Sequence, residues 1–281
     1  MREKEIARQT IEALEAGQYA VANGDIVAFA PLLNKCVTTT KCYSPETLST
    51  LRDLILAQPV KYGRTVFEVV NEATLTGCER LLGMDPDLRI TVLNFASAKN
   101  PGGGFMGGAR AQEESLARSS GLYKSLLRCS DYYAFHRRQK SLLYSDRMIF
   151  SPACPVLRDD QGEWLSQPYT VNFITSAAPN AGAIASNDPR EATKIPEVFR
   201  ERVGKVLALA ADHDCDTLLL GAWGCGAFRN DPKLVARLFW EYLNPNGVFW
   251  GRFPRVVFSV LDKHESLGNY HAFTERFAAG A

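Results

Sequence analysis

The stretch that decides the fold is residues 89–114, which read RITVLNFASAKNPGGGFMGGARAQEE. The first seven residues, 89–95, are a run of β-branched and apolar residues that predicts a buried strand. A loop with glycines at 102–104 and 107–108 follows, and a helix is predicted from Glu113 to Leu127. Because glycine loses more conformational freedom on folding than other residues, five of them after a strand indicate a backbone that approaches something closely.

Strand and helix continue to alternate on both sides of this stretch. Further strands are predicted at 65–70, 148–150, 170–175, 216–222 and 255–261, and further helices at 3–17, 45–56, 73–82, 197–211, 232–242 and 271–277. This alternation predicts an α/β sandwich with a largely parallel sheet and helices on both faces.

The chain is predicted to divide near residue 60 into two parts. Residues 1–60 are predicted to be an N-terminal helical extension packed on the body, and 61–281 the α/β domain. β-branched residues at 36–40 predict one short strand within the extension. The polar segments 158–168 and 179–192 are interpreted as loops, and the second is long enough to bind a ligand.

Acidic and basic residues almost balance, because the 281 residues carry a formal net charge of +1. A non-specific nucleic-acid binder needs a surplus of Lys and Arg, so this balance favours recognition in a local pocket. The chain has neither a run of roughly 18 apolar residues nor a secretory h-region in its N-terminal MREKEIARQTIEALEAG. We therefore expect a cytoplasmic protein with no membrane partner and no sequence-specific nucleic-acid partner.

Cysteine and histidine spacing gives no sign of a metal site. Seven cysteines are scattered without CxxC pairs, which predicts reduced and mostly buried thiols. Four histidines show no ligand spacing such as HExxH. We expect neither a metal nor a cofactor, and we interpret residues 136–140 (HRRQK) as a solvated basic patch in preference to a track for a polymer.

A second glycine-rich loop, residues 221–232 (GAWGCGAFRNDP), follows the strand predicted at 216–222. Small residues before a helix N-terminus leave backbone N–H groups free to bind a phosphate, although a plain tight turn is the simpler explanation. Two such loops in one α/β sheet favour a shared diphosphate cleft. Cys225 has no nearby histidine in the sequence, so we reject it as a nucleophile.

The first loop has two alternative interpretations. Glu113 and Glu114 in the first turn of a helix complement the helix dipole, so they could serve only as caps. Gly102, Gly104 and Gly107 also match the dinucleotide-binding pattern GxGxxG. Residues 99–101 separate the strand from these glycines, however, which disfavours a nicotinamide-dependent oxidoreductase.

The triglycine at 102–104, followed seven residues later by Gln112-Glu113-Glu114, resembles the signature of poly(ADP-ribose) glycohydrolases. The surrounding NPGGGFMGGARAQEESLARSSGLY is similar to the compact microbial-type branch of this family. The second loop recurs in the expected order, so the resemblance covers nearly the whole chain. It implies a macrodomain-like mixed sheet between helices, with the ligand at the carboxyl ends of the central strands.

The resemblance also implies an activity, the hydrolysis of ribose–ribose O-glycosidic bonds in poly(ADP-ribose) with release of ADP-ribose. This cleavage needs an acid for the leaving oxygen and a base for water. Glu114 is expected to serve as both, with Glu113 holding ribose hydroxyls. The substrate-binding residues that the resemblance implies are Asn100, Gly102, Gly103, Gly104, Gln112, Gly224, Cys225, Gly226, Ala227 and Phe228.

Within that set, Gly224 to Ala227 are expected at the diphosphate and Phe228 at the distal ribose. Asn94 and Ser97 are further candidates for ribose contact, and residues 180–187 are expected near the adenine. The expected partners are poly(ADP-ribose) or ADP-ribose and ADP-ribosylated proteins.

Two other functions would use the same cleft. One is a macrodomain that binds ADP-ribose without cleaving it. The other is a hydrolase of mono-ADP-ribosylated proteins or of small ADP-ribose derivatives. A binding module does not need residues 112–114 intact, so their presence favours the glycohydrolase.

Overall fold

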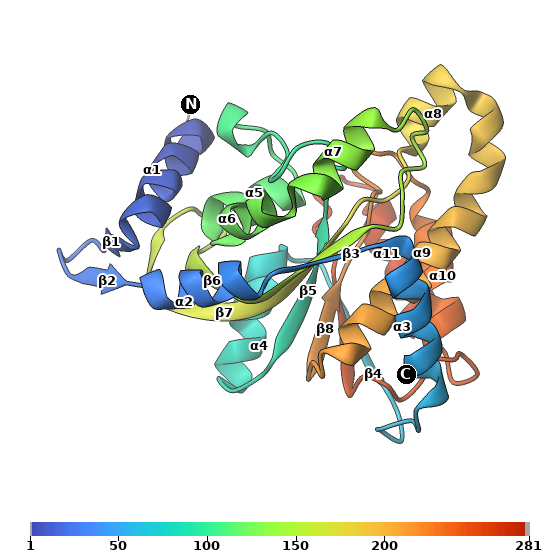
Figure 1. Cartoon of the computed structure of the whole chain (residues 1–281). Coiled ribbons are helices and arrows are strands. Elements are labelled where there is room, and N and C mark those ends of the chain that lie inside the picture. The colour runs from blue at the N-terminus through green and yellow to red at the C-terminus, as the bar shows by residue number, and fades with distance from the viewer. Residues whose placement is uncertain (1, 279–281) are drawn as a thin grey trace.

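A computed structural model describes residues 2–278 of the chain (Figure 1). Within this range, seven strands form the main sheet, in the order β3-β6-β7-β5-β8-β9-β4. Their bounds are β3 Lys41–Tyr43, β4 Val66–Val70, β5 Ile90–Phe95, β6 Met148–Arg158, β7 Trp164–Ser176, β8 Thr217–Leu220 and β9 Arg255–Ser259. A separate two-stranded hairpin is formed by β1 (Gln18–Ala20) and β2 (Ile26–Ala28).

Helices cover both faces of the sheet (Figure 1). Their bounds are α1 Arg2–Ala16, α2 Ala30–Thr39, α3 Pro45–Ala57, α4 Thr74–Met84, α5 Gln112–Ser119, α6 Leu122–Leu126, α7 Ser130–Arg138, α8 Ala181–Asn187, α9 Ile195–Asp212, α10 Pro232–Leu243 and α11 Gly268–Ala278. None of the helices in residues 2–278 combines the length and the apolar character needed to cross a bilayer.

Neighbouring strands from β7 through β5, β8 and β9 to the edge strand β4 pair in parallel, whereas β3–β6 and β6–β7 are antiparallel. The sheet is therefore mixed, and the predicted α/β class is confirmed. Parallel pairing brings the carboxyl ends of β5, β7 and β8 to the same edge, since Phe95 faces Ser176 and Val92 faces Leu219. The two glycine-rich loops leave the sheet at this edge.

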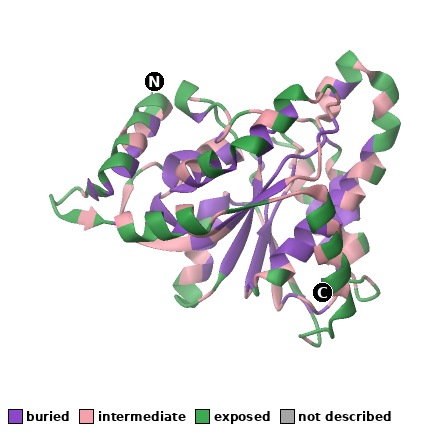
Figure 2. Ribbon diagram, viewed as in Figure 1, coloured by how far each residue is buried: buried purple, intermediate pink, exposed green. Residues whose placement is uncertain are grey.

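Alternate residues of the central strands enter two different cores, because successive side chains of a strand point to opposite faces. Leu218 and Leu220 pack with α3, α9, α10 and α11, while Leu219 packs with α4, α5 and α6. β5 and β8 are buried on both faces (Figure 2), as expected for parallel strands covered by helices. The rigid sheet fixes the positions from which the loops start.

The N-terminal sixty residues are mostly helical and also contribute to the sheet. The strand predicted at 36–40 is wrong, since these residues end α2 and the strand begins at Lys41. Leu33 and Cys36 bury one face of this helix, and that burial outweighs the β propensity of a short Val-Thr run. β3 pairs with β6, and α3 packs against α9. The division at residue 60 stays a prediction.

The helix predicted at 113–127 is in fact two helices, α5 and α6, separated at Ser120 and Gly121. Ser120 bridges Val156 of β6, which removes it from the helix. A Cβ at Gly121 would lie 2.7 Å from Leu33 Cδ1, so α2 and the helix break approach each other at a glycine. Tertiary contacts therefore interrupt a pattern that is locally helical.

Both predicted loops contain regular structure. Most of 158–168 belongs to the long β6–β7 hairpin, in which only residues 159–163 form the turn. Within 179–192, α8 begins after Asn180, whose side-chain oxygen accepts the Ala183 N–H at 3.0 Å. Asn caps helices well in this way, although the same residue also favours turns.

The predicted basic patch at 136–140 is only partly correct. Arg137 and Arg138 are exposed at the end of α7, but His136 is fully buried. His136 shares the buried face of α7 with Tyr132, four residues earlier, and with Tyr133. This helical spacing was the available signal that His136 points inward.

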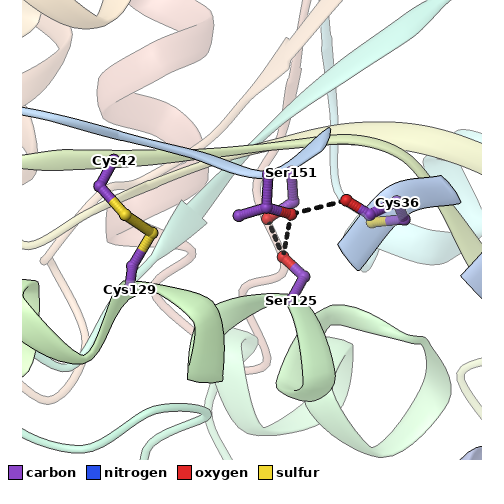
Figure 3. The surroundings of a disulfide bond; sticks show 6 residues. Cys36, Cys42, Ser125, Cys129 and Ser151 are labelled. Atoms are coloured by element: carbon purple, nitrogen blue, oxygen red, sulfur yellow. Dashed lines mark hydrogen bonds between the residues drawn. A yellow bond between two sulfur atoms is a disulfide. The ribbon is translucent and has the colours of Figure 1, made fainter. Parts of the chain in front are cut away.

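A disulfide joins Cys42 of β3 to Cys129 just before α7 (Figure 3). The expectation that all seven cysteines are reduced is therefore wrong for this pair. The sequence did not indicate the bond, because 87 residues separate the two cysteines and no local motif links them. Cys36 lies in the same region but keeps a free, buried thiol, as do Cys78, Cys154 and Cys215.

We expect Cys42→Ser to lower the free energy of unfolding by roughly 4 kcal/mol, because the cross-link, which closes a loop of 87 residues, no longer restricts the unfolded chain. Cys42 is exposed, so the substitution itself disturbs little packing. Urea unfolding with and without reductant measures the effect. Reductant should shift the parent curve to that of Cys42→Ser and leave the variant's own curve in place, and an unmoved parent curve would contradict the prediction.

Candidate active site

The two acidic residues at the start of α5 lie against the glycines of the first loop. Glu114 is partly exposed, and its Oε1 accepts the Gly104 N–H at 2.9 Å. Gly103 adopts a φ of +60°, and a Cβ there would overlap Glu114 Oε1 and lie 3.1 Å from Glu113 Oε2. Both carboxyl groups therefore occupy the space that a side chain at residue 103 would need, and only glycine leaves room for them.

Glu113 points into the protein and is only 2% exposed. Its Oε2 accepts the Ser97 N–H at 2.6 Å and its Oε1 accepts from Asn94 Nδ2 at 3.3 Å. Burial raises the pKa of Glu113 to about 8, and it outweighs the lowering by these two hydrogen bonds. The neighbouring Glu114 charge raises the pKa further. Glu113 is thus largely neutral at pH 7.

This raised pKa predicts a pH dependence of stability. The folded chain keeps a proton on Glu113 that the unfolded chain loses above its ordinary pKa of 4.5. The free energy of unfolding should therefore fall as the pH rises from 4.5 to about 8, by up to about 1.4 kcal/mol per pH unit. Urea unfolding of the parent and of Glu113→Gln at several pH values isolates this contribution. Equal slopes for the two proteins across this window would refute it.

Gln112 is the remaining residue of the Gln-Glu-Glu motif, and its amide forms hydrogen bonds to the end of β5. Its Oε1 accepts the Phe95 N–H at 2.8 Å, and its Nε2 donates to Leu93 O at 2.8 Å and Thr74 Oγ1 at 3.2 Å. These bonds attach the start of α5 to the sheet and so orient the two acids. A substrate contact of Gln112 stays a prediction.

Three other candidates of the first loop differ in exposure. Asn94 is fully buried and also donates to Thr175 Oγ1 at 3.1 Å, so it supports Glu113 from inside the protein. Ser97 Oγ accepts the backbone N–H groups of Lys99 and Asn100, which shapes the turn before the glycines. Asn100 is exposed at the rim of the loop.

In the second loop the backbone lies close against neighbouring side chains. Gly224 has a φ of +74°, and a Cβ there would lie 2.6 Å from both Ala178 Cβ and Asn230 Nδ2. Asn230 Nδ2 binds Pro179 O at 2.8 Å and Gly224 O at 3.0 Å, which holds the loop closed at its base. Gly226 and Ala227 are exposed at its tip.

Cys225 sits within this loop as a partly buried thiol. Burial raises its pKa well above the ordinary range, so the thiol stays protonated at neutral pH. The thiolate is the nucleophilic form of cysteine. This agrees with the rejection of Cys225 as a nucleophile.

The two loops converge at the carboxyl edge of the sheet. β5 and β8 are parallel neighbours, and a Cβ at Gly221 would lie 3.0 Å from Phe95 Cζ. Ala98 of the first loop and Phe228 of the second pack in one apolar cluster. The starts of the two glycine-rich loops therefore lie next to each other at this edge.

Sequence patterns did not reveal the side chains that support this site from other elements. Tyr144, between α7 and β6, packs against Phe228 with a ring separation of 6.0 Å. Arg137 of α7 donates to Lys99 O at 2.8 Å and so contacts the first loop. Among residues 2–278, no group of three or more His, Cys, Asp or Glu side chains is placed to hold a metal ion.

Comparisons with known proteins agree with this geometry. Residues 7–159 match the family model for the microbial-type poly(ADP-ribose) glycohydrolase catalytic domain. A solved glycohydrolase from Thermomonospora curvata is 46% identical, with 98% of this chain and 99% of that chain covered and a TM-score of 0.93. The same enzyme has been solved with the inhibitor ADP-HPD, at 47% identity over 98% of this chain and 99% of that one, with a TM-score of 0.91.

A third structure, the Deinococcus radiodurans glycohydrolase in complex with ADP-ribose, is 43% identical over 89% of this chain and 98% of that chain, with a TM-score of 0.83. A comparison with curated proteins found no match. The family model covers more than half of the chain, and the solved structures cover almost all of it. The chain therefore belongs to the microbial-type poly(ADP-ribose) glycohydrolase family.

Proposed function

We propose that Glu114 is the general acid and base with which this chain hydrolyses the ribose–ribose bonds of poly(ADP-ribose). The observation that carries the proposal is that both carboxyl groups fill the side-chain space at Gly103, at the edge where the two glycine-rich loops converge. Glu114 is the more exposed of the two acids, so its carboxyl group is the one that a ligand can reach.

In this reaction Glu114 gives up one proton and later takes one back. Glu114 donates a proton to the 2′-oxygen of the leaving ribose as the bond from this oxygen to the anomeric carbon breaks. The Glu114 carboxylate then takes a proton from water as the water oxygen attacks the positively charged anomeric carbon. The products are ADP-ribose and a polymer shortened by one unit, and Glu114 returns to its protonated state.

Glu113 has a different role, which follows from its burial. A largely neutral carboxyl group places no second negative charge beside Glu114, and it can both donate to and accept from ribose hydroxyls. We assign Glu113 to hold the distal ribose. The hydrogen bonds from Ser97 and Asn94 keep its carboxyl group in one orientation.

The second loop is assigned to the rest of the ligand. Gly224 to Ala227 would bind the diphosphate through backbone N–H groups, and Phe228 would pack on the distal ribose. The Deinococcus radiodurans neighbour was solved with ADP-ribose and the Thermomonospora curvata neighbour with ADP-HPD, which supports ADP-ribose as the ligand here. Substrate contacts of Asn100, Gly102 and Gln112, a cytoplasmic location and ADP-ribosylated proteins as partners stay predictions.

Incubation with an auto-modified ADP-ribose polymerase tests the proposal. Free ADP-ribose, separated by chromatography, is the expected product, and the polymer should shorten. Tight polymer binding without release of ADP-ribose would instead identify a binding module. Removal of only the last, protein-linked ADP-ribose would identify a hydrolase of mono-ADP-ribosylated proteins.

A further inference from the structure

Tyr144 is one of five non-glycine residues with positive φ in residues 2–278, and its φ is +58°. A bulky residue at positive φ is a conformational outlier, and such outliers persist only where surrounding contacts impose them. Tyr144 lies in the segment between α7 and β6, which belongs to neither glycine-rich loop. Its side chain is nearly buried, with 9% exposed.

A fully buried arginine of α9 holds this segment in place. Arg202 donates to the backbone oxygens of Leu143 at 3.0 Å, Tyr144 at 3.4 Å and Ala177 at 2.8 Å. The same guanidinium pairs with Asp146 at 2.8 Å, which compensates its charge. The Arg202 side chain thus attaches the segment around Tyr144 both to α9 and to the end of β7.

A buried histidine of α7 holds this segment from the other side. His136 Nε2 lies 3.2 Å from the Ser145 backbone N and 2.8 Å from Ser145 Oγ. A backbone N–H can only donate, so Nε2 is the acceptor and Nδ1 carries the proton that it donates to Tyr132 O at 2.9 Å. Burial lowers the pKa of His136 to about 4, which keeps the ring neutral.

The held side chain connects the two loops of the site. The Tyr144 ring lies 6.0 Å from the Phe228 ring and 5.8 Å from the His136 ring, centre to centre. Tyr144 also packs in one apolar cluster with Ala98 of the first loop and Ala177 at the end of β7. Phe228 is therefore backed by an aromatic ring that has little freedom to move.

We infer that Tyr144 is a positioning residue, which sets Phe228 against the distal ribose and so aligns the anomeric carbon with Glu114. The inference rests on the proposed function, in which Phe228 packs on that ribose. A reacting atom displaced by about 1 Å can cost about a hundredfold in rate. Loss of the Tyr144 ring should therefore affect kcat more than it affects ligand binding.

Tyr144→Gly tests this, because glycine accepts the positive φ and removes only the ring. We expect kcat for ADP-ribose release to fall about 10-fold, while the Kd for ADP-ribose changes less than about threefold. Tyr144→Phe keeps the ring and should restore kcat to near the parent value. Should Tyr144→Gly fail to fold, Tyr144→Asn replaces it, since Asn also tolerates positive φ.

Asp214→Gly is the matched control. Asp214 has a φ of +48° and lies just before β8, at the opposite edge of the sheet, so its substitution should leave kcat unchanged. A second measurement combines Tyr144→Gly with Phe228→Ala. If Tyr144 acts through Phe228, the double variant loses little more kcat than Phe228→Ala alone.

Two results would overturn the inference. One is a Tyr144→Gly variant that has a lower Tm but the parent kcat, which would leave Tyr144 a structural role only. The other is a double variant whose losses multiply, which would mean that Tyr144 does not act through Phe228. A parent protein that binds ADP-ribose but releases none from the polymer would instead overturn the proposed function, so the two failures can be told apart.

Discussion

Glu114→Gln is expected to lower kcat for ADP-ribose release by about 10³-fold, within the range that a general acid and base contributes. The amide has the shape of the carboxyl group, and its oxygen can still accept the Gly104 N–H. It can neither deliver a proton to the leaving oxygen nor take one from water. Binding does not need that proton, so the Kd for ADP-ribose should stay within a few-fold of the parent value.

The measurement pairs single-turnover release of ADP-ribose from polymer with calorimetric titration of ADP-ribose. Glu46→Gln is the matched control, because Glu46 also lies in the first turn of a helix, α3, which packs against α9 and belongs to neither glycine-rich loop. It makes the same change from a carboxyl group to an amide and should leave kcat unchanged. Parent-like turnover by Glu114→Gln would remove Glu114 from the mechanism.

Gly103→Ala is expected to lower kcat by about 10²-fold, since the added methyl group displaces the catalytic carboxyl. A Cβ at this position would lie 2.9 Å from Glu114 Cδ and 3.1 Å from Glu113 Oε2, so both side chains must move. The φ of +60° adds backbone strain to any residue other than glycine. The side chain of Glu114 is retained, but it no longer lies where the reaction needs it.

Gly107→Ala provides the control from the same loop. Nothing lies within 4 Å of a Cβ placed at Gly107, and this residue is not at positive φ. Its kcat and Tm should match those of the parent. If Gly103→Ala and Gly107→Ala have the same kcat, close contact of the Gly103 backbone with the acids is not required for the reaction.

The two variants test different parts of one site. Glu114→Gln changes the chemistry at constant geometry, whereas Gly103→Ala changes the geometry at constant chemistry. A lower kcat in both variants would indicate that the reaction needs the carboxyl group and its position beside Gly103 together. Retained ADP-ribose binding in both would separate this loss from unfolding of the cleft.

The sequence by itself determined the α/β class, the two glycine-rich loops and the acidic pair. These features depend on short stretches, such as the apolar strand at 90–95 followed by five glycines and two acids, and neighbours in sequence decide them. Most helices and strands were predictable for the same reason. The errors occurred where burial opposed local preference, as in α2, or where a distant contact broke a helix, as at Gly121.

Only the tertiary structure decided which distant residues support the site. The Cys42–Cys129 disulfide, the burial of His136 and the positive φ of Tyr144 each depend on contacts between segments far apart in the chain. Periodicity reports which face of an element is apolar, but it does not report which element covers that face. The side chains that bind ligand could therefore be proposed from sequence, whereas those that hold them in position became visible only once the chain was folded.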